Sequence, residues 1–160
     1  MNEAVPPTII VRSPRENPRK CSILPLRGRP DFLFFTYPVD RPLDLARYVR
    51  LAADGPALSP NDASAGILLL DGSWNRASAM NRAFIHVPAR SLIGYQTAYP
   101  RVSKRGTDPA HGLASVEALY IAYQILGRST QGLLAHYPWR EEFCRLNGFG
   151  TESEPTANGS

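Results

Sequence analysis

Residues 66–75 have the sequence GILLLDGSWN, and this stretch decides the interpretation of the rest of the chain. Its first part is a continuous apolar run, which is typical of a strand buried on both faces of a parallel sheet. The run ends at Asp71, and a polar cluster follows where the strand would stop. Ligands bind beyond the carboxyl ends of the strands in open α/β sheets. The stretch therefore predicts a central strand with a ligand site at residues 71–75.

Two strands are predicted upstream, at Pro7–Arg12 and Asp31–Tyr37. Both are short, rich in β-branched and aromatic residues, and bounded by Pro or Gly. A helix is predicted over Asp44–Ala53, because apolar residues recur there at helical spacing and Gly55 and Pro56 follow.

Downstream of the polar cluster, a helix is predicted over Trp74–Phe84 and a strand over Ser91–Thr97. The basic segment from Ala98 to Gly112 is interpreted as a loop, and a loop of that length is uncommon unless it has a function.

The sequence predicts its clearest helix over Ser115–Leu126, where apolar residues form one stripe. Ser115 is placed as the cap, Glu117 is interpreted as a partner of the helix dipole, and Gly127 ends the helix.

Further helical segments are predicted over Thr130–Tyr137 and from Pro138, as the first helical residue, to a stop at Gly148. Residues 150–160 have no core-forming side chains and are interpreted as a disordered tail. The order of elements predicts one α/β domain over residues 1–149 with a mainly parallel sheet.

Composition excludes several classes of protein. The 160 residues contain no apolar run long enough to span a membrane and no leader-like N-terminus, which predicts a cytoplasmic protein without a membrane partner. Cys21 and Cys144 lie far apart and without clustered histidines, so no metal site is predicted and both are interpreted as structural or free thiols.

Basic residues are concentrated between Gly72 and Thr107, a stretch that contains no Asp or Glu. Aromatic residues lie between these basic residues, and a basic face with aromatic side chains suits a nucleic-acid backbone. A solvated surface without a partner explains the same charges equally well. The basic residues are Arg76, Arg82, Arg90, Arg101, Lys104 and Arg105.

The polar cluster suits a cationic ligand. Trp74 can offer its ring face to a sulfonium, and Asp71 can orient a ligand or accept a proton. The alternative is that Asp71 or Ser73 caps the next helix while Trp74 fills the core.

Three segments give these residues a context, because LLLDGSWNRA, ARSLIGYQTAYPR and GLASVEALYIAY occur in that order. With them the chain resembles the small-subunit rRNA aminocarboxypropyltransferases, a SPOUT-like family related to the DTW-domain tRNA enzymes. The motifs of that family are D-x-S-W, R-x-L followed by Ala and Pro, L-S-x-V-E-A, and K-C-T. D-x-S-W is matched by Asp71, Ser73 and Trp74, and K-C-T by Lys20, Cys21 and Ser22. The R-x-L motif and the Ala and Pro after it are matched by Arg90, Leu92, Ala98 and Pro100. L-S-x-V-E-A is matched by Leu113, Ser115, Val116, Glu117 and Ala118.

The chain departs from the family pattern at several positions, and Ala114 stands in place of the first Ser of L-S-x-V-E-A. Tyr99 stands where the family has Asn, and Ile93 stands where it has Pro. The loop that follows is also longer and more basic, so the identity of the substrate does not follow from the resemblance.

The resemblance implies a C-terminal trefoil knot and transfer of the aminocarboxypropyl group of S-adenosylmethionine (SAM) to a uridine-type base. Asp71 would be the catalytic base or would only orient SAM, and the start of the helix at Ser115 would receive the SAM carboxylate. The implied SAM-binding residues are Ser22, Asp71, Ser73, Trp74, Leu92, Ile93, Tyr95, Ala98, Tyr99, Leu113 and Ser115. The implied RNA-binding residues are Arg76, Arg82, Arg101, Lys104 and Arg105.

The expected partner is structured RNA, with rRNA favoured over tRNA and a role in ribosome biogenesis. Three alternatives remain: the same transfer to tRNA, a SPOUT RNA methyltransferase, and a non-catalytic RNA-binding module for ribosome assembly. The sequence leaves the oligomeric state open.

Overall fold

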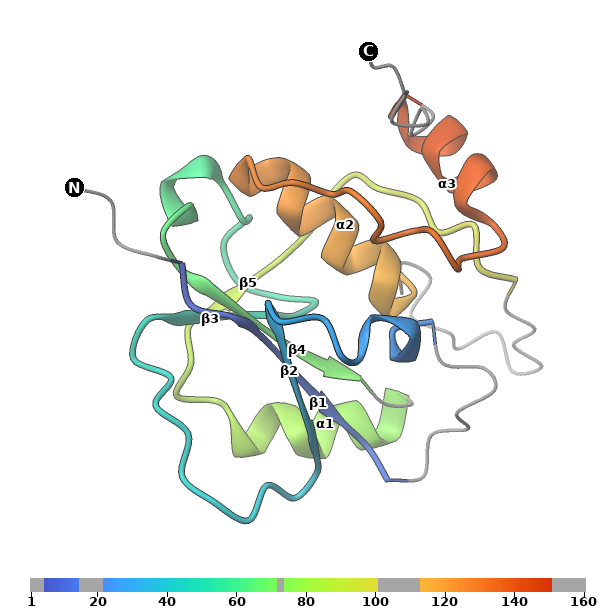
Figure 1. Cartoon of the computed structure of the whole chain (residues 1–160). Helices are drawn as coiled ribbons and strands as arrows, with labels where there is room; N and C mark the ends of the chain where they lie inside the picture. Colours follow the sequence, from blue (N-terminus) through green and yellow to red (C-terminus); the bar gives the residue numbers. More distant parts are fainter. Residues whose placement is uncertain (1–4, 15–21, 72–73, 101–112, 151–160) are drawn as a thin grey trace.

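A computed structural model describes residues 5–14, 22–71, 74–100 and 113–150 of the chain. Its five strands form one sheet in the order β2-β1-β4-β3-β5, and every neighbouring pair is parallel (Figure 1). The prediction of one α/β domain with a mainly parallel sheet is confirmed. The strands are β1 (Thr8–Arg12), β2 (Phe32–Thr36), β3 (Tyr48–Leu51), β4 (Gly66–Asp71) and β5 (Ala89–Arg90).

Helices cover the sheet on both faces, which gives three layers. Helix α1 (Trp74–Ala83) covers one face and α2 (Ser115–Leu126) covers the other, with α3 (Arg140–Asn147) lying beyond α2 (Figure 1). Two short 3-10 helices, η2 (Leu24–Leu26) and η3 (Pro60–Asp62), lie in the connections.

Strand β4 lies in the middle of the sheet, hydrogen-bonded to β1 and β3. Ile67 and Leu69 belong to the core on the α2 side, whereas Leu68 packs with Met80 of α1 on the other side. Because both faces are covered, an apolar residue is favoured at every position, as the sequence GILLL predicts.

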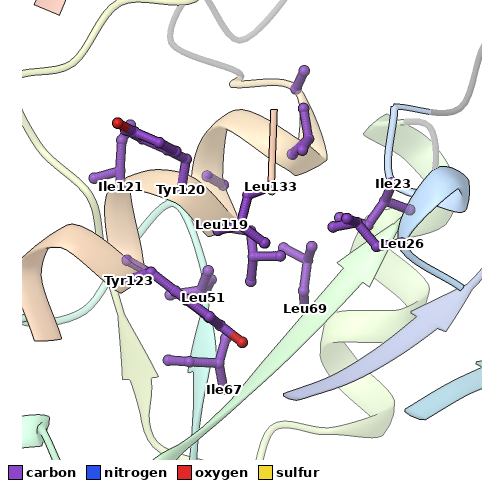
Figure 2. Packing of buried hydrophobic residues seen from close by; sticks show 14 of the residues in the cluster. Ile23, Leu26, Leu51, Ile67, Leu69, Leu119, Tyr120, Ile121, Tyr123 and Leu133 are labelled. Atoms are coloured by element: carbon purple, nitrogen blue, oxygen red, sulfur yellow. The ribbon is translucent and has the colours of Figure 1, made fainter. Parts of the chain in front are cut away.

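The larger core lies between α2 and the sheet. Figure 2 shows Leu119 of α2 with Ile67 and Leu69 of β4 in this core, and Leu119 is fully buried. Helix α2 has its predicted bounds and ends at Gly127, whose φ of 73° is the left-handed conformation that glycine adopts easily.

The predicted helix over Asp44–Ala53 is wrong, because its centre is strand β3. Tyr48 faces the α1 side while Val49 and Leu51 belong to the core on the α2 side. These few apolar residues fit a helical spacing as well as a strand, and pairing with β4 and β5 favours the strand.

The predicted strand over Ser91–Thr97 is also wrong. Beyond β5 the chain makes one isolated bridge, between Ser91 and Ala57, and Gly94 then adopts a φ of 94°. Residues 92–100 leave the sheet and run along α2 towards α3 (Figure 1).

The predicted helix over Thr130–Tyr137 is a series of turns, in which Gly132 has a φ of 80°. Pro138 is not the first helical residue as predicted, because α3 begins at Arg140; it ends at Asn147, and Gly148 is its C-terminal cap. The glycine in the left-handed conformation prevents one continuous helix through this region.

The expected knot depends on residues 101–112, which lie outside the described residues, so it stays a prediction. The disordered tail predicted for residues 150–160 also stays a prediction, because all of it except Gly150 lies outside them. Among the described residues, no helix is long and apolar enough to cross a membrane.

We predict that Gly66→Ala destabilises the fold by about 1–3 kcal/mol. A Cβ at Gly66 would lie 2.5 Å from the ring of Tyr48, and that ring is fixed by its hydroxyl, which donates to the Pro7 carbonyl at 2.6 Å. Urea denaturation measures the loss. Gly150→Ala is the control, because a Cβ there meets no atom within 4 Å. Equal stability of the two variants would contradict the predicted clash.

Candidate functional site

The Asp71 carboxylate joins three elements at the C-terminal edge of the sheet. Arg12 is its register partner at the end of β1 and donates from Nε to Asp71 Oδ2 at 3.2 Å. The hydroxyl of Ser115, in the first turn of α2, donates to Asp71 Oδ1. The side chains of Arg12 and Asp71 are 14% and 11% exposed, so water screens this ion pair little. The sequence predicts a ligand site at this edge of the sheet, and its binding role stays a prediction.

Arg12 is a member of this site that the sequence analysis did not identify. Its Nη2 atom is buried and has no hydrogen-bond partner among the described residues. The signal was present in the sequence, because Arg12 ends a predicted strand of the parallel sheet. The pairing of β1 with β4 could not be read from the sequence.

The start of α2 contacts two predicted site residues, Ser22 and Asp71. The Val116 N–H donates to Ser22 Oγ at 3.1 Å, so Ser22 satisfies one of the free donors of the first turn. Ser115 is not the cap as predicted. Ala114 holds that position, and the Ser115 hydroxyl turns to Asp71 instead. Ser22, Asp71 and Ser115 thus converge.

Glu117 is fully buried and organises the surroundings of the site. Its carboxylate accepts hydrogen bonds from the N–H groups of Ala114 (2.8 Å) and Ala98 (2.9 Å) and from the hydroxyls of Thr97 and Tyr137 (both 2.6 Å). Four donors satisfy a group that only accepts. The interpretation of Glu117 as a dipole partner missed three of these contacts, because their donors are distant in sequence.

Asn147, the last residue of α3, fixes the segment between β5 and residue 100. Its Oδ1 accepts from the Gln96 N–H at 2.7 Å, and its Nδ2 donates to the Gln96 carbonyl and to the Phe143 carbonyl, both at 2.8 Å. The side-chain amide pairs with the Gln96 backbone as a neighbouring strand would. This contact holds the segment beside α3, although the segment does not belong to the sheet.

Aromatic contacts hold the same segment on both sides of Gln96. Tyr95 stacks on Phe149 with ring centroids 6.1 Å apart, and Tyr99 meets the edge of Trp139 at 5.2 Å. Ile93 remains 72% exposed and offers an apolar surface to a ligand.

Of the other predicted site residues, some are half-buried and others lie outside the described residues. Leu92, Ala98 and Leu113 are half-buried against the core on the α2 side. Ser73 and the side chains of Trp74 and Arg76 lie outside what the structure describes, as do Arg101, Lys104 and Arg105.

Two arginines of the basic stretch are described. Arg82 is exposed in the last turn of α1, on the face of the sheet opposite α2. Arg90 donates from Nε to Asp62 at 3.2 Å, so this residue serves an ion pair within the fold.

Comparison with known proteins finds similarity among solved structures. No family model and no curated protein sequence matches the chain. Among solved structures, the chain is similar to Tsr3 from Vulcanisaeta distributa, described as a SAM-dependent rRNA:acp-transferase. The TM-score is 0.69 at 25% sequence identity, and the match covers 91% of this chain and 80% of that chain. This similarity supports the family resemblance, whereas the relation to SPOUT and DTW-domain enzymes stays a prediction.

We predict a graded loss of stability when the contacts of Glu117 are removed. Tyr137→Phe removes one donor and should cost about 1–2 kcal/mol, whereas Glu117→Gln sets an amide N–H against buried donors and should cost more. Thermal and urea denaturation measure both. Glu141→Gln, on the exposed surface of α3, is the control and should change stability by less than about 0.5 kcal/mol. A Glu117 variant as stable as this control would contradict the role of Glu117.

We predict that Asn147→Ala accelerates hydrogen exchange of the Gln96 amide about five- to tenfold, because that amide loses its acceptor. Asn147→Asp keeps an acceptor for this amide and should exchange more slowly than Asn147→Ala. Exchange measured by NMR distinguishes them, with Arg145→Ala on the same helix as the control. If Gln96 exchanges equally in all variants, Asn147 does not hold the segment.

Proposed function

We propose that this chain transfers the aminocarboxypropyl group of SAM to a base in rRNA. The observation that carries the proposal is the similarity to Tsr3 over most of the chain, together with the position of Asp71 at the carboxyl end of the central strand. Ser115, which bonds to Asp71, and Ser22, which bonds to the start of α2, are polar groups that the family resemblance assigns to SAM.

The described residues fit SAM. Asp71 and the Ser22 and Ser115 hydroxyls form a polar end of the site, which suits the amino-acid moiety. Residues 92–100 form an irregular segment with exposed Ile93, which suits a purine through backbone hydrogen bonds and apolar contact. Glu117 and Asn147 hold this segment in place through hydrogen bonds to Ala98 and Gln96.

SAM supplies an electrophilic methylene carbon next to its sulfonium, so that attack by a base nitrogen forms a carbon–nitrogen bond, breaks the carbon–sulfur bond and releases methylthioadenosine. Asp71 is positioned to accept the proton that the attacking nitrogen loses. Its two oxygens already accept hydrogen bonds from Arg12 and Ser115, and these bonds fix the orientation of the carboxylate. A fixed acceptor needs little reorganisation during the reaction.

We further propose a uridine-type base as the target, because its imide N–H is a weak acid that a carboxylate can help to deprotonate. The target must be unpaired or flipped out to reach Asp71. Exposed Arg82, and Arg76, Arg101, Lys104 and Arg105 by their sequence positions, would contact phosphates and set the register of the RNA.

Three alternatives remain for the same fold. Transfer to tRNA needs no change in the described site. Methyl transfer uses the same ligand with another carbon facing the nucleophile. A non-catalytic module for ribosome assembly would keep the basic surface and would not turn over SAM.

The test uses two preparations of SAM, one radiolabelled in the carboxyl carbon and one in the methyl group, each incubated with the protein and with total RNA from cells that lack its gene. We expect only the carboxyl label to enter RNA, in the small-subunit rRNA band. Asp71→Asn should lower the rate at least about a hundredfold if Asp71 is the base.

Each other outcome selects an alternative. Transfer of the methyl label would identify a methyltransferase, and carboxyl label in the tRNA band would change the substrate class. If neither label enters any RNA while the protein still binds RNA, the non-catalytic module is favoured and the transferase is rejected.

A further inference from the structure

A cavity opens at the edge of the sheet opposite Asp71, and its volume is about 400 Å³. Thr8, the first residue of β1, and Asp31, which precedes β2, line it from the sheet. Tyr123, in the last turn of α2, and Arg128, just beyond that helix, also line it. Because the strands are parallel, their first residues share one edge, whereas Asp71 is the last residue of β4 at the other edge. The cavity is therefore separate from the proposed SAM site.

Arg128 has hydrogen-bonding capacity that the described fold leaves unused. Its Nη2 donates to the carbonyls of Ala63 and Ala65. Its Nη1 donates to no described residue, and its Nε is a buried donor without a partner among them. None of the described carboxylates forms an ion pair with Arg128. A half-buried arginine in this state favours an anion, because a desolvated charge without a partner of opposite sign is costly.

The surroundings of the Arg128 charge favour an anion for a second reason. Burial lowers the pKa of Arg128 below its usual value, because the charged form has lost water. A negative group beside the guanidinium would compensate for that loss. Pro6, Pro7 and Pro30 add apolar wall to the cavity, which reduces the screening of charges by water.

The Arg128 guanidinium is fixed in position by the fold. It lies over the ring of Tyr123, with its Cζ atom 5.7 Å from the ring centroid. That ring is itself held, because the Tyr123 and Thr8 hydroxyls share a hydrogen bond of 2.5 Å. The next residue, exposed Ser129, also lines the cavity, and its hydroxyl accepts from the Gln131 N–H at 3.3 Å while keeping its own proton to donate. A ligand therefore meets an oriented cation and an adjacent hydroxyl.

The second arginine of the cavity is neutralised. Arg29 donates from Nε and Nη2 to the two carboxylate oxygens of Asp31, at 3.2 and 3.3 Å, and from Nη1 to the Gln131 carbonyl at 3.3 Å. The cavity wall thus carries two positive side chains and one negative side chain. The surplus positive charge belongs to Arg128, and Asp31 limits the affinity of the cavity for an anion.

We propose that this cavity binds the phosphate group of a phosphate ester, with Arg128 and Ser129 as donors to its oxygens. A phosphate has several strong acceptor oxygens and a negative charge, which match a guanidinium beside a hydroxyl. A cavity of this volume also accommodates the organic part of an ester, which would lie against the prolines. The phosphate can belong to a small phosphomonoester or to the backbone of RNA. The inference goes beyond the proposed transferase activity and does not rest on it.

The experiment is an NMR titration of the isotope-labelled protein at constant ionic strength, in which the amide signals of Thr8, Arg128 and Ser129 are followed. The probes are ribose 5-phosphate, ribose as its match without phosphate, and a short RNA that has no terminal phosphate. We expect ribose 5-phosphate to shift the three signals with a Kd of about 1 mM or below, and ribose to leave them unchanged.

Variants test the assignment of the donors. Arg128→Gln should weaken the binding of ribose 5-phosphate about ten- to a hundredfold, and Ser129→Ala about three- to tenfold. Asp31→Asn should strengthen it about threefold or more, because the charge of Arg29 is then released, and a gain of binding cannot result from unfolding. Arg41→Gln is the control, because it removes a positive charge from a 70% exposed side chain and should leave the affinity unchanged.

The proposal is overturned if neither ribose 5-phosphate nor the RNA shifts the three signals, or if ribose shifts them as much as its phosphate ester does. It is also overturned if Arg128→Gln binds as tightly as the unmodified protein, or if Asp31→Asn binds no more tightly. Shifts of the same signals by the RNA identify the RNA backbone as the source of the phosphate, and shifts by ribose 5-phosphate alone identify a small phosphomonoester. The transferase activity is tested separately with SAM, so failure of one proposal leaves the other standing.

Discussion

The buried carboxylate of Glu117 is the constraint on which the site depends. A charged group can remain in the interior only when hydrogen bonds replace its water, so its four donors must come together in one arrangement. They come from residues 97–98, from Ala114 and from Tyr137. One side chain in the first turn of α2 thus fixes the segment that follows β5 and the turns that precede α3.

The parallel sheet supplies the second half of the site. Parallel register places the last residues of β1 and β4 side by side, so Arg12 and Asp71 meet without a loop to align them. Strands are rigid, and functional groups at their ends are held more precisely than groups on loops. The chemistry proposed for this edge therefore depends on two strand ends and one helix start. The more adaptable segment, residues 92–100, contributes the binding surface.

Local patterns predicted the elements whose burial is uniform. The apolar run of β4 predicts a strand and the apolar stripe of α2 predicts a helix. Each pattern has one interpretation, and both elements are confirmed. The segment that forms β3 has two interpretations, a helix and a strand. Only its pairing with β4 and β5 decides between them. Asp71 was singled out at the end of the apolar run, and Ser22 and Ser115 through motif resemblance; their roles in binding stay predictions. Arg12 and Asn147 were missed, because each has its role through a residue at least fifty positions away.

The contact between Asn147 and Gln96 has a consequence for the order in which the protein matures. A ribosome delivers the chain from its N-terminus, so the sheet, α1 and α2 can all assemble before Asn147 emerges. Until then the Gln96 backbone has no side-chain amide to pair with, and residues 92–100 lack one of their fixed points. The surface proposed for SAM is therefore completed last. In a newly made chain, these hydrogen bonds to Gln96 form only after α3 has been synthesised and has docked.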